Sequence, residues 1–111
     1  MLGSKYQGVL NAAQRVRLIP NTCAIQNTQP HSPGEHWIGV GCFKDAHGKI
    51  KTMGFDTYGR NEDFEARRQL SVDVWTDPDK HQTLNSEVCG AMALAWCVIF
   101  IRRGYVVAAE V

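Results

Sequence analysis

The longest apolar run of the chain, Val88–Ile101, constrains the fold more than any other segment. Gly90 alone interrupts it, and Asn85 or Ser86 just before it is a residue type that commonly caps a helix. Gly104 follows it, and glycine is typical of the position after a helix C-terminus. The run is shorter than the roughly 20 residues that a membrane-spanning helix needs. We therefore expect a buried core helix that begins at residue 85 or 86 and ends near Gly104.

Shorter segments around this helix predict a small sheet. Runs rich in β-branched, aromatic and other apolar residues predict strands over residues 22–28, 37–43, 50–55 and 72–75. The turn residues at 45–49 predict that the strands at 37–43 and 50–55 form a hairpin. The apolar residues of 4–18 have nearly helical spacing, which predicts a helix that Pro20 ends. A short helix could form over residues 63–70, and a last strand or a tail over residues 105–111. The pattern predicts an α+β fold: one compact domain over residues 1–111, with a mixed or antiparallel sheet packed on the buried helix.

Composition narrows the class of protein. Hydrophobic residues make up 44% and charged residues 21%, which is typical of a globular chain. The net charge of +1 provides little attraction for nucleic acid, and the N-terminus lacks the apolar stretch of a signal peptide. The four cysteines have neither CxxC spacing nor the close Cys/His spacing of structural zinc sites. We expect reduced thiols, no metal and an intracellular setting.

Cys89 is the first candidate for chemistry. The predicted helix places it in the first turn, where backbone N–H groups and the helix dipole stabilise a thiolate. Gly90 directly after it allows a substrate or a second backbone to approach closely. The alternative is a buried structural cysteine, which is the role expected for Cys97 on the same helix.

A cysteine nucleophile needs a base, an orienting group and donors for the oxyanion. His36 precedes the strand at 37–43, and Asp56 follows the strand at 50–55, so an antiparallel pairing of these strands brings the two together. Gln82 precedes the helix and could join the Cys89 N–H in an oxyanion hole. Three other histidines are equally available on spacing grounds and are expected on surface loops: His31, His47 and His81.

Several motifs carry a resemblance to a known family. The segments GEHW at 34–37, FDTYG at 55–59, CAIQNT at 23–28 and NSEVCG at 85–90 resemble the adenovirus protease (adenain) group, which belongs to the clan that contains the SUMO-deconjugating proteases. The chain order His, Asp, Gln, Cys is also the order of that clan. The matching motifs lie within residues 21–103.

The resemblance implies an adenain-like, papain-type core and a role for each candidate residue. Cys89 is then the nucleophile, His36 the general base and acid, and Asp56 the orienting group, while Gln82 and the Cys89 N–H form the oxyanion hole. Trp37 then walls the substrate cleft. Asp stands at position 56 where adenovirus enzymes carry Glu, but the SUMO-protease branch uses Asp.

The same resemblance implies a viral cysteine endopeptidase that cleaves capsid or core precursor proteins after small residues such as Gly, in the virion and the infected cell. Its partners would be protein or polyprotein substrates, and no metal or membrane is involved. An activating peptide or partner chain and, more weakly, nucleic acid stay open as further partners. The sequence itself gives no support for activation as in adenoviruses, because residues 71–75 contain no tethering cysteine and the net charge is small. The alternatives are a deconjugase for a ubiquitin-like modifier, a non-catalytic relative and an acyltransferase.

Overall fold

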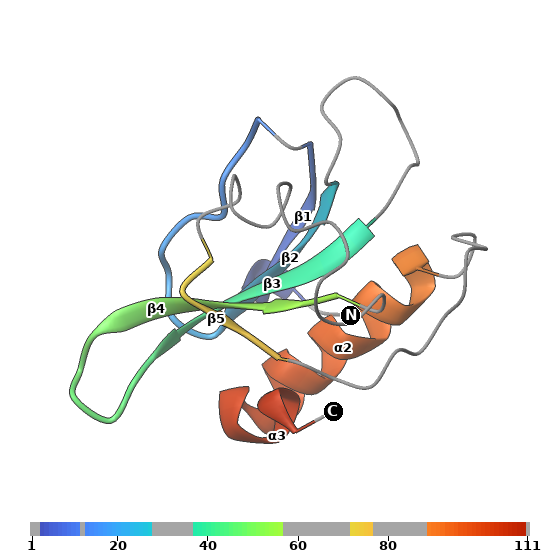
Figure 1. Ribbon diagram of the computed structural model, residues 1–111. Helices are drawn as coiled ribbons and strands as arrows, with labels where there is room; N and C mark the ends of the chain where they lie inside the picture. Colours follow the sequence, from blue (N-terminus) through green and yellow to red (C-terminus); the bar gives the residue numbers. More distant parts are fainter. Residues whose placement is uncertain (1–2, 12, 28–36, 57–71, 77–88, 111) are drawn as a thin grey trace.

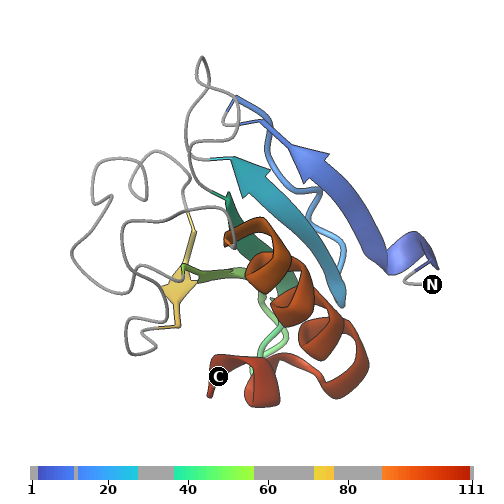
Figure 2. The same ribbon diagram turned by 90° about the vertical axis from the view of Figure 1, so that its right-hand side faces the viewer.

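The computed structural model describes residues 3–11, 13–27, 37–56, 72–76 and 89–110. Within them the chain forms a five-stranded mixed sheet in the order β1-β2-β3-β4-β5. The elements are η1 (Gly3–Lys5), β1 (Tyr6–Leu10), β2 (Thr22–Asn27), β3 (Trp37–Lys44), β4 (Ile50–Phe55), β5 (Val74–Trp75), α2 (Cys89–Arg103) and α3 (Tyr105–Ala109). Helix α2 lies across one face of the sheet, with α3 beside its C-terminal end (Figures 1 and 2). The α+β prediction is therefore confirmed, with two parallel strand pairs at the edges of an antiparallel centre.

Strands β3 and β4 form the predicted hairpin. Their turn is closed by hydrogen bonds from Asp45 N to Lys49 O at 2.8 Å and from Gly48 N to Asp45 O at 3.0 Å. The Asp45 carboxylate also accepts the backbone N–H groups of His47 and Lys49. Gly48 has a φ of +80°, a conformation that side chains other than glycine's rarely adopt. The hairpin holds β3 and β4 in a continuous register from Lys44↔Ile50 to Gly39↔Phe55.

The core lies between α2 and the sheet. From α2 it receives side chains at helical spacing, Ala93, Trp96, Cys97 and Phe100, and from the strands alternate residues that include Cys23, Ile25, Phe43, Met53 and Phe55. Strand β3 carries glycine where the helix passes over it. A Cβ at Gly39 would lie 2.6 Å from Trp96 Cε3, and a Cβ at Gly41 would lie 2.5 Å from Phe100 Cε2. These two glycines let α2 approach the centre of the sheet closely.

The helix ends as predicted. The N–H of Gly104 donates to Phe100 O at 3.0 Å, and Gly104 has a φ of +88°. The chain then turns into α3 instead of the strand or tail expected at 105–111, so that prediction is wrong. Two tertiary contacts account for the difference: Trp96 Nε1 donates to Ala108 O at 3.0 Å, and Tyr105 stacks on Phe43 with ring centroids 4.3 Å apart.

The helix predicted over residues 4–18 is also wrong, because this segment forms η1, the strand β1 and an irregular return to β2. Gln7 ties the return to the strand: its Nε2 donates to Arg17 O at 2.9 Å, and its Oε1 accepts Arg17 N at 2.7 Å. Gly8 has a φ of +94°, which is incompatible with a right-handed helix. The strand predicted at 72–75 is present only as Val74–Trp75, and the short helix predicted at 63–70 lies outside the described residues.

Candidate active site

Three ends of secondary structure meet on one side of the molecule. Strand β3 begins at Trp37 and strand β4 ends at Phe55, and the pairing of Gly39 with Phe55 puts these ends next to each other. Helix α2 begins at Cys89 and lies near the same end of β3 (Figure 1). The predicted antiparallel pairing that should bring residues 36 and 56 to one edge of the sheet is therefore present in the backbone.

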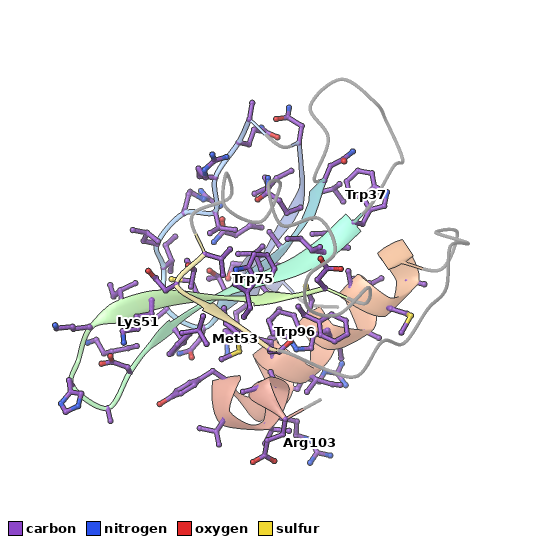
Figure 3. The ribbon with its side chains drawn as sticks, in the orientation of Figure 1. Trp37, Lys51, Met53, Trp75, Trp96 and Arg103 are labelled. Carbon is purple, nitrogen blue, oxygen red and sulfur yellow. The ribbon has the colours of Figure 1, made fainter. Side chains whose placement is uncertain are left out.

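Trp37 links the sheet to the first turn of the helix. It is the first residue of β3, pairs with Asn27 across the sheet and packs against the core cluster as a partly buried side chain. A Cβ at Gly90 would lie 3.7 Å from Trp37 Cδ1, so the indole is in van der Waals range of the residue that follows Cys89. Figure 3 shows Trp37 at the end of β3 that is nearer the start of α2. The structure thus gives Trp37 a packing role at the start of the helix, and its role as a wall of the substrate cleft stays a prediction.

Asp56 continues β4 by one residue and is fully buried, with 0% of its surface exposed. A carboxylate is costly to bury unless it is hydrogen-bonded or paired with a positive group. Its position beyond Phe55 places it toward the first residues of β3, which are the neighbours of His36 in the chain. A buried carboxylate at this position suits the role of an orienting group for a histidine.

Cys89 is the first residue of α2, so its backbone lies at the positive end of a helix of 15 residues. The side chain of Cys89 lies outside the described residues, and so do His36 and Gln82. The same holds for the helix cap expected at residue 85 or 86 and for two of the other histidines, His31 and His81. Of the predicted site, the structure places Trp37 and Asp56 at neighbouring strand ends and the start of α2 beside Trp37. His47, the other candidate, lies in the β3–β4 turn at the opposite end of the hairpin.

The other cysteines have a different environment. Cys23, Cys42 and Cys97 are free thiols with 0% exposure. Burial raises the pKa of Cys23 well above its ordinary value, and the hydrogen bond to Cys97 raises it further. Burial also raises the pKa of Cys42. Cys97 is fully buried in the cluster under α2, so the structural role expected for it fits its position in the core.

The contact between Cys23 and Cys97 was not foreseen from the sequence. Their Sγ atoms lie 2.7 Å apart, although 74 positions separate the residues. The available signal was periodicity: position 23 shares a strand face with Ile25, and position 97 shares a helix face with Ala93 and Phe100. That signal places both thiols in one core, but it does not show that they touch.

A pocket lies on the face of the sheet opposite α2. Its volume is about 260 Å³, and its walls come from three central strands and the two segments beside them: Arg15, Val16, Leu18, Gln26, Val40, Thr52 and Val72. It adjoins the second, smaller apolar cluster around Ile38 and Val40. The pocket therefore lies on the other face of the sheet from Trp37, which packs in the cluster under α2.

The described residues contain no group of three or more His, Cys, Asp or Glu side chains that could hold a metal ion. Within the same part of the chain, no helix has both the length and the apolar character needed to cross a membrane. In comparisons with protein-family models, curated proteins and solved structures, the chain matched none.

Proposed function

We propose that this protein is a cysteine endopeptidase with an adenain-like, papain-type core. The observation that carries the proposal is that Trp37, at the start of β3, lies in van der Waals range of the first turn of α2, with the buried Asp56 at the adjoining end of β4. The motifs around His36 and Cys89 that resemble the adenain group support it independently.

In the proposed mechanism, His36 takes the proton of the Cys89 thiol, and the thiolate attacks the carbonyl carbon of a peptide bond. The Cys89 N–H and the Gln82 side-chain amide stabilise the oxyanion that develops. His36 then protonates the leaving amine, and water hydrolyses the thioester to release the acid. Asp56 holds the imidazole in the productive tautomer throughout.

The proposed substrates are capsid or core precursor proteins of a virus, cut after small residues such as Gly. Trp37 supports this preference, because a large aromatic side chain beside the first turn of α2 leaves little room near the nucleophile. The proposed setting is the virion and the infected cell. No metal is needed for these steps, because the thiolate and the oxyanion hole supply the nucleophile and the charge stabilisation.

The test is covalent labelling with a peptide that ends in Gly-Gly followed by a thiol-reactive group. Wild-type protein should be labelled at Cys89, and Cys89→Ala should lose the label. Cys42→Ala is the matched control, since it removes a buried thiol from the face of the sheet opposite α2, and it should label normally. Labelling that persists in Cys89→Ala, or wild type that never labels, would contradict the proposal and favour a non-catalytic relative.

A second comparison separates peptidase from deconjugase. The protein is offered a Gly-containing precursor peptide and, in parallel, a ubiquitin-like modifier joined to a lysine side chain. The proposal predicts faster cleavage of the peptide. Cleavage of the conjugate alone would make the protein a deconjugase, and transfer of the acyl group to an added amine in preference to water would make it an acyltransferase.

A further inference from the structure

The structure brings together two thiols that the proposed catalysis does not use. Cys23 lies on β2 and Cys97 on α2, both with 0% exposure, and their Sγ atoms are 2.7 Å apart. Non-bonded carbon atoms rest at roughly 3.5–4.0 Å, and sulfur is larger than carbon, so this separation is short for two thiols. We propose that Cys23 and Cys97 are a disulfide-forming pair that cross-links the sheet to the helix bearing Cys89.

The pair needs little movement to bond. A disulfide has an S–S length of about 2.05 Å, so the two sulfur atoms have to approach by roughly 0.7 Å. The thiols already point toward each other: the Cys23 thiol donates to Cys97 Sγ, and the Cys97 thiol donates to Ala24 O at 3.5 Å.

The other cysteines are poorly placed to compete. Cys42 lies on β3 beside Thr22, on the face of the sheet that points away from α2, whereas Cys23 points toward the helix. Cys89 and Cys97 lie on the same helix, eight residues apart, which separates their Cα atoms by roughly 12 Å. A disulfide cannot span that distance. Pairing of Cys23 with Cys97 therefore leaves Cys89 free.

The oxidant is a low-molecular-weight disulfide of the glutathione type. One thiolate of the pair attacks a sulfur of that disulfide, breaks its S–S bond and releases one reduced thiol. The second protein thiolate attacks the mixed disulfide and releases the second small thiol. Two protein thiols and one small disulfide thus give one protein disulfide and two small thiols. Because both thiols have 0% exposure in the folded state, the oxidant reaches them before α2 docks, as during folding, and the docked fold then holds the two sulfur atoms side by side.

The test is refolding of the reduced protein in a buffer of reduced and oxidised glutathione, followed by alkylation and mapping by mass spectrometry without reduction. The expected product is a linked pair of peptides carrying Cys23 and Cys97, with Cys42 and Cys89 alkylated. The oxidised form should also unfold at a temperature about 8 °C or more above the reduced form. Measurements on wild-type protein alone suffice, so the test does not depend on a variant that folds.

Two variants provide matched controls. Cys97→Ser should lose both the linked peptides and the gain in unfolding temperature, whereas Cys42→Ser should keep both. Separate alkylation of Cys23 and Cys97 at every glutathione ratio would overturn the proposal. A different linked pair, or an oxidised form that unfolds at the same temperature as the reduced form, would overturn it as well. None of these outcomes depends on peptidase activity.

Discussion

At the scale of single residues, the buried carboxylate of Asp56 carries much of the functional argument. Its side chain has no exposed surface, and it follows directly on the strand that pairs with the start of β3. Carboxyl groups are among the side chains least often fully buried unless they are paired. A fully buried aspartate at this position fits the proposed role of orienting the His36 imidazole.

Replacement of Asp56 by Asn tests that role. The amide has nearly the same shape, so the fold should survive, but it no longer holds the imidazole in the tautomer that can accept the thiol proton. Turnover of a Gly-containing peptide should fall by about 100-fold or more, while the far-ultraviolet circular dichroism stays unchanged.

Asp45→Asn is the control for that experiment. It makes the same chemical change in the β3–β4 turn, at the far end of the hairpin, and should leave turnover as it is. Wild-type turnover in Asp56→Asn would remove Asp56 from the catalytic group.

At the scale of secondary structure, the close approach of α2 to β3 positions the start of the helix beside Trp37. Gly39 and Gly41 make this approach possible, because Trp96 and Phe100 occupy the space that their side chains would fill. The helix has no comparable constraint at Gly90, where a Cβ would meet Trp37 Cδ1 at an ordinary 3.7 Å.

Alanine substitutions at these glycines should therefore have different effects. Gly41→Ala should lower the free energy of unfolding by about 1–3 kcal/mol, the usual cost of overpacking a core. Gly90→Ala should leave it unchanged or raise it by up to about 1 kcal/mol, because alanine is the better helix former. Urea denaturation measures both, and a Gly41→Ala protein as stable as wild type would contradict the described packing.

The elements that the sequence predicted correctly are those decided by local features. Strands β2, β3 and β4 show apolar patterns bounded by turn residues, and α2 has an apolar run with a glycine after its end. The two elements predicted wrongly depend on distant partners. Strand β1 is held by Gln7 through Arg17 and Thr22, and α3 is held by Trp96 through Ala108.

The same distinction holds for the site. Position in the chain relative to strand and helix ends predicted that residues 36, 56 and 89 lie at one end of the sheet. The structure shows the neighbouring ends of β3 and β4 at that place, with the start of α2 beside Trp37, while residue 36 lies outside the described residues. The contact of Trp37 with Gly90 and that of Cys23 with Cys97 depend on how α2 is rotated on the sheet. That rotation results from tertiary packing, which local sequence patterns do not specify.

At the scale of the whole molecule, the sheet separates two apolar clusters of unequal size. The larger lies under α2 and includes Cys23 and Cys97, and the smaller surrounds Ile38 and Val40 on the other face. Thiols buried in the larger cluster make the stability of the reduced protein depend on pH. The pKa of Cys23 is raised by burial, so the folded state keeps a proton that the unfolded state releases.

Stability of the reduced protein should therefore fall in alkaline solution. The contribution of Cys23 is fully present below the unfolded pKa of about 8.5 and is lost as the pH rises toward the higher folded pKa. In that interval the free energy of unfolding should fall by about 1.4 kcal/mol per pH unit for this thiol. Urea denaturation between neutral and alkaline pH measures the slope, which should be shallower in Cys23→Ala; equal slopes in the two proteins would contradict the account.

The pH dependence of alkylation at each cysteine, read by peptide mass spectrometry, tests the central claim most directly. The account predicts that Cys89 alone reacts rapidly at a pH well below about 8.5, which is the pKa of a free thiol. It also predicts that His36→Ala removes this reactivity. Cys97, buried on the same helix, should react slowly throughout and serves as the internal control. If Cys89 reacts as slowly as Cys97, or if its profile is the same in His36→Ala, the thiolate–imidazolium pair is absent and the proposed catalytic site is wrong.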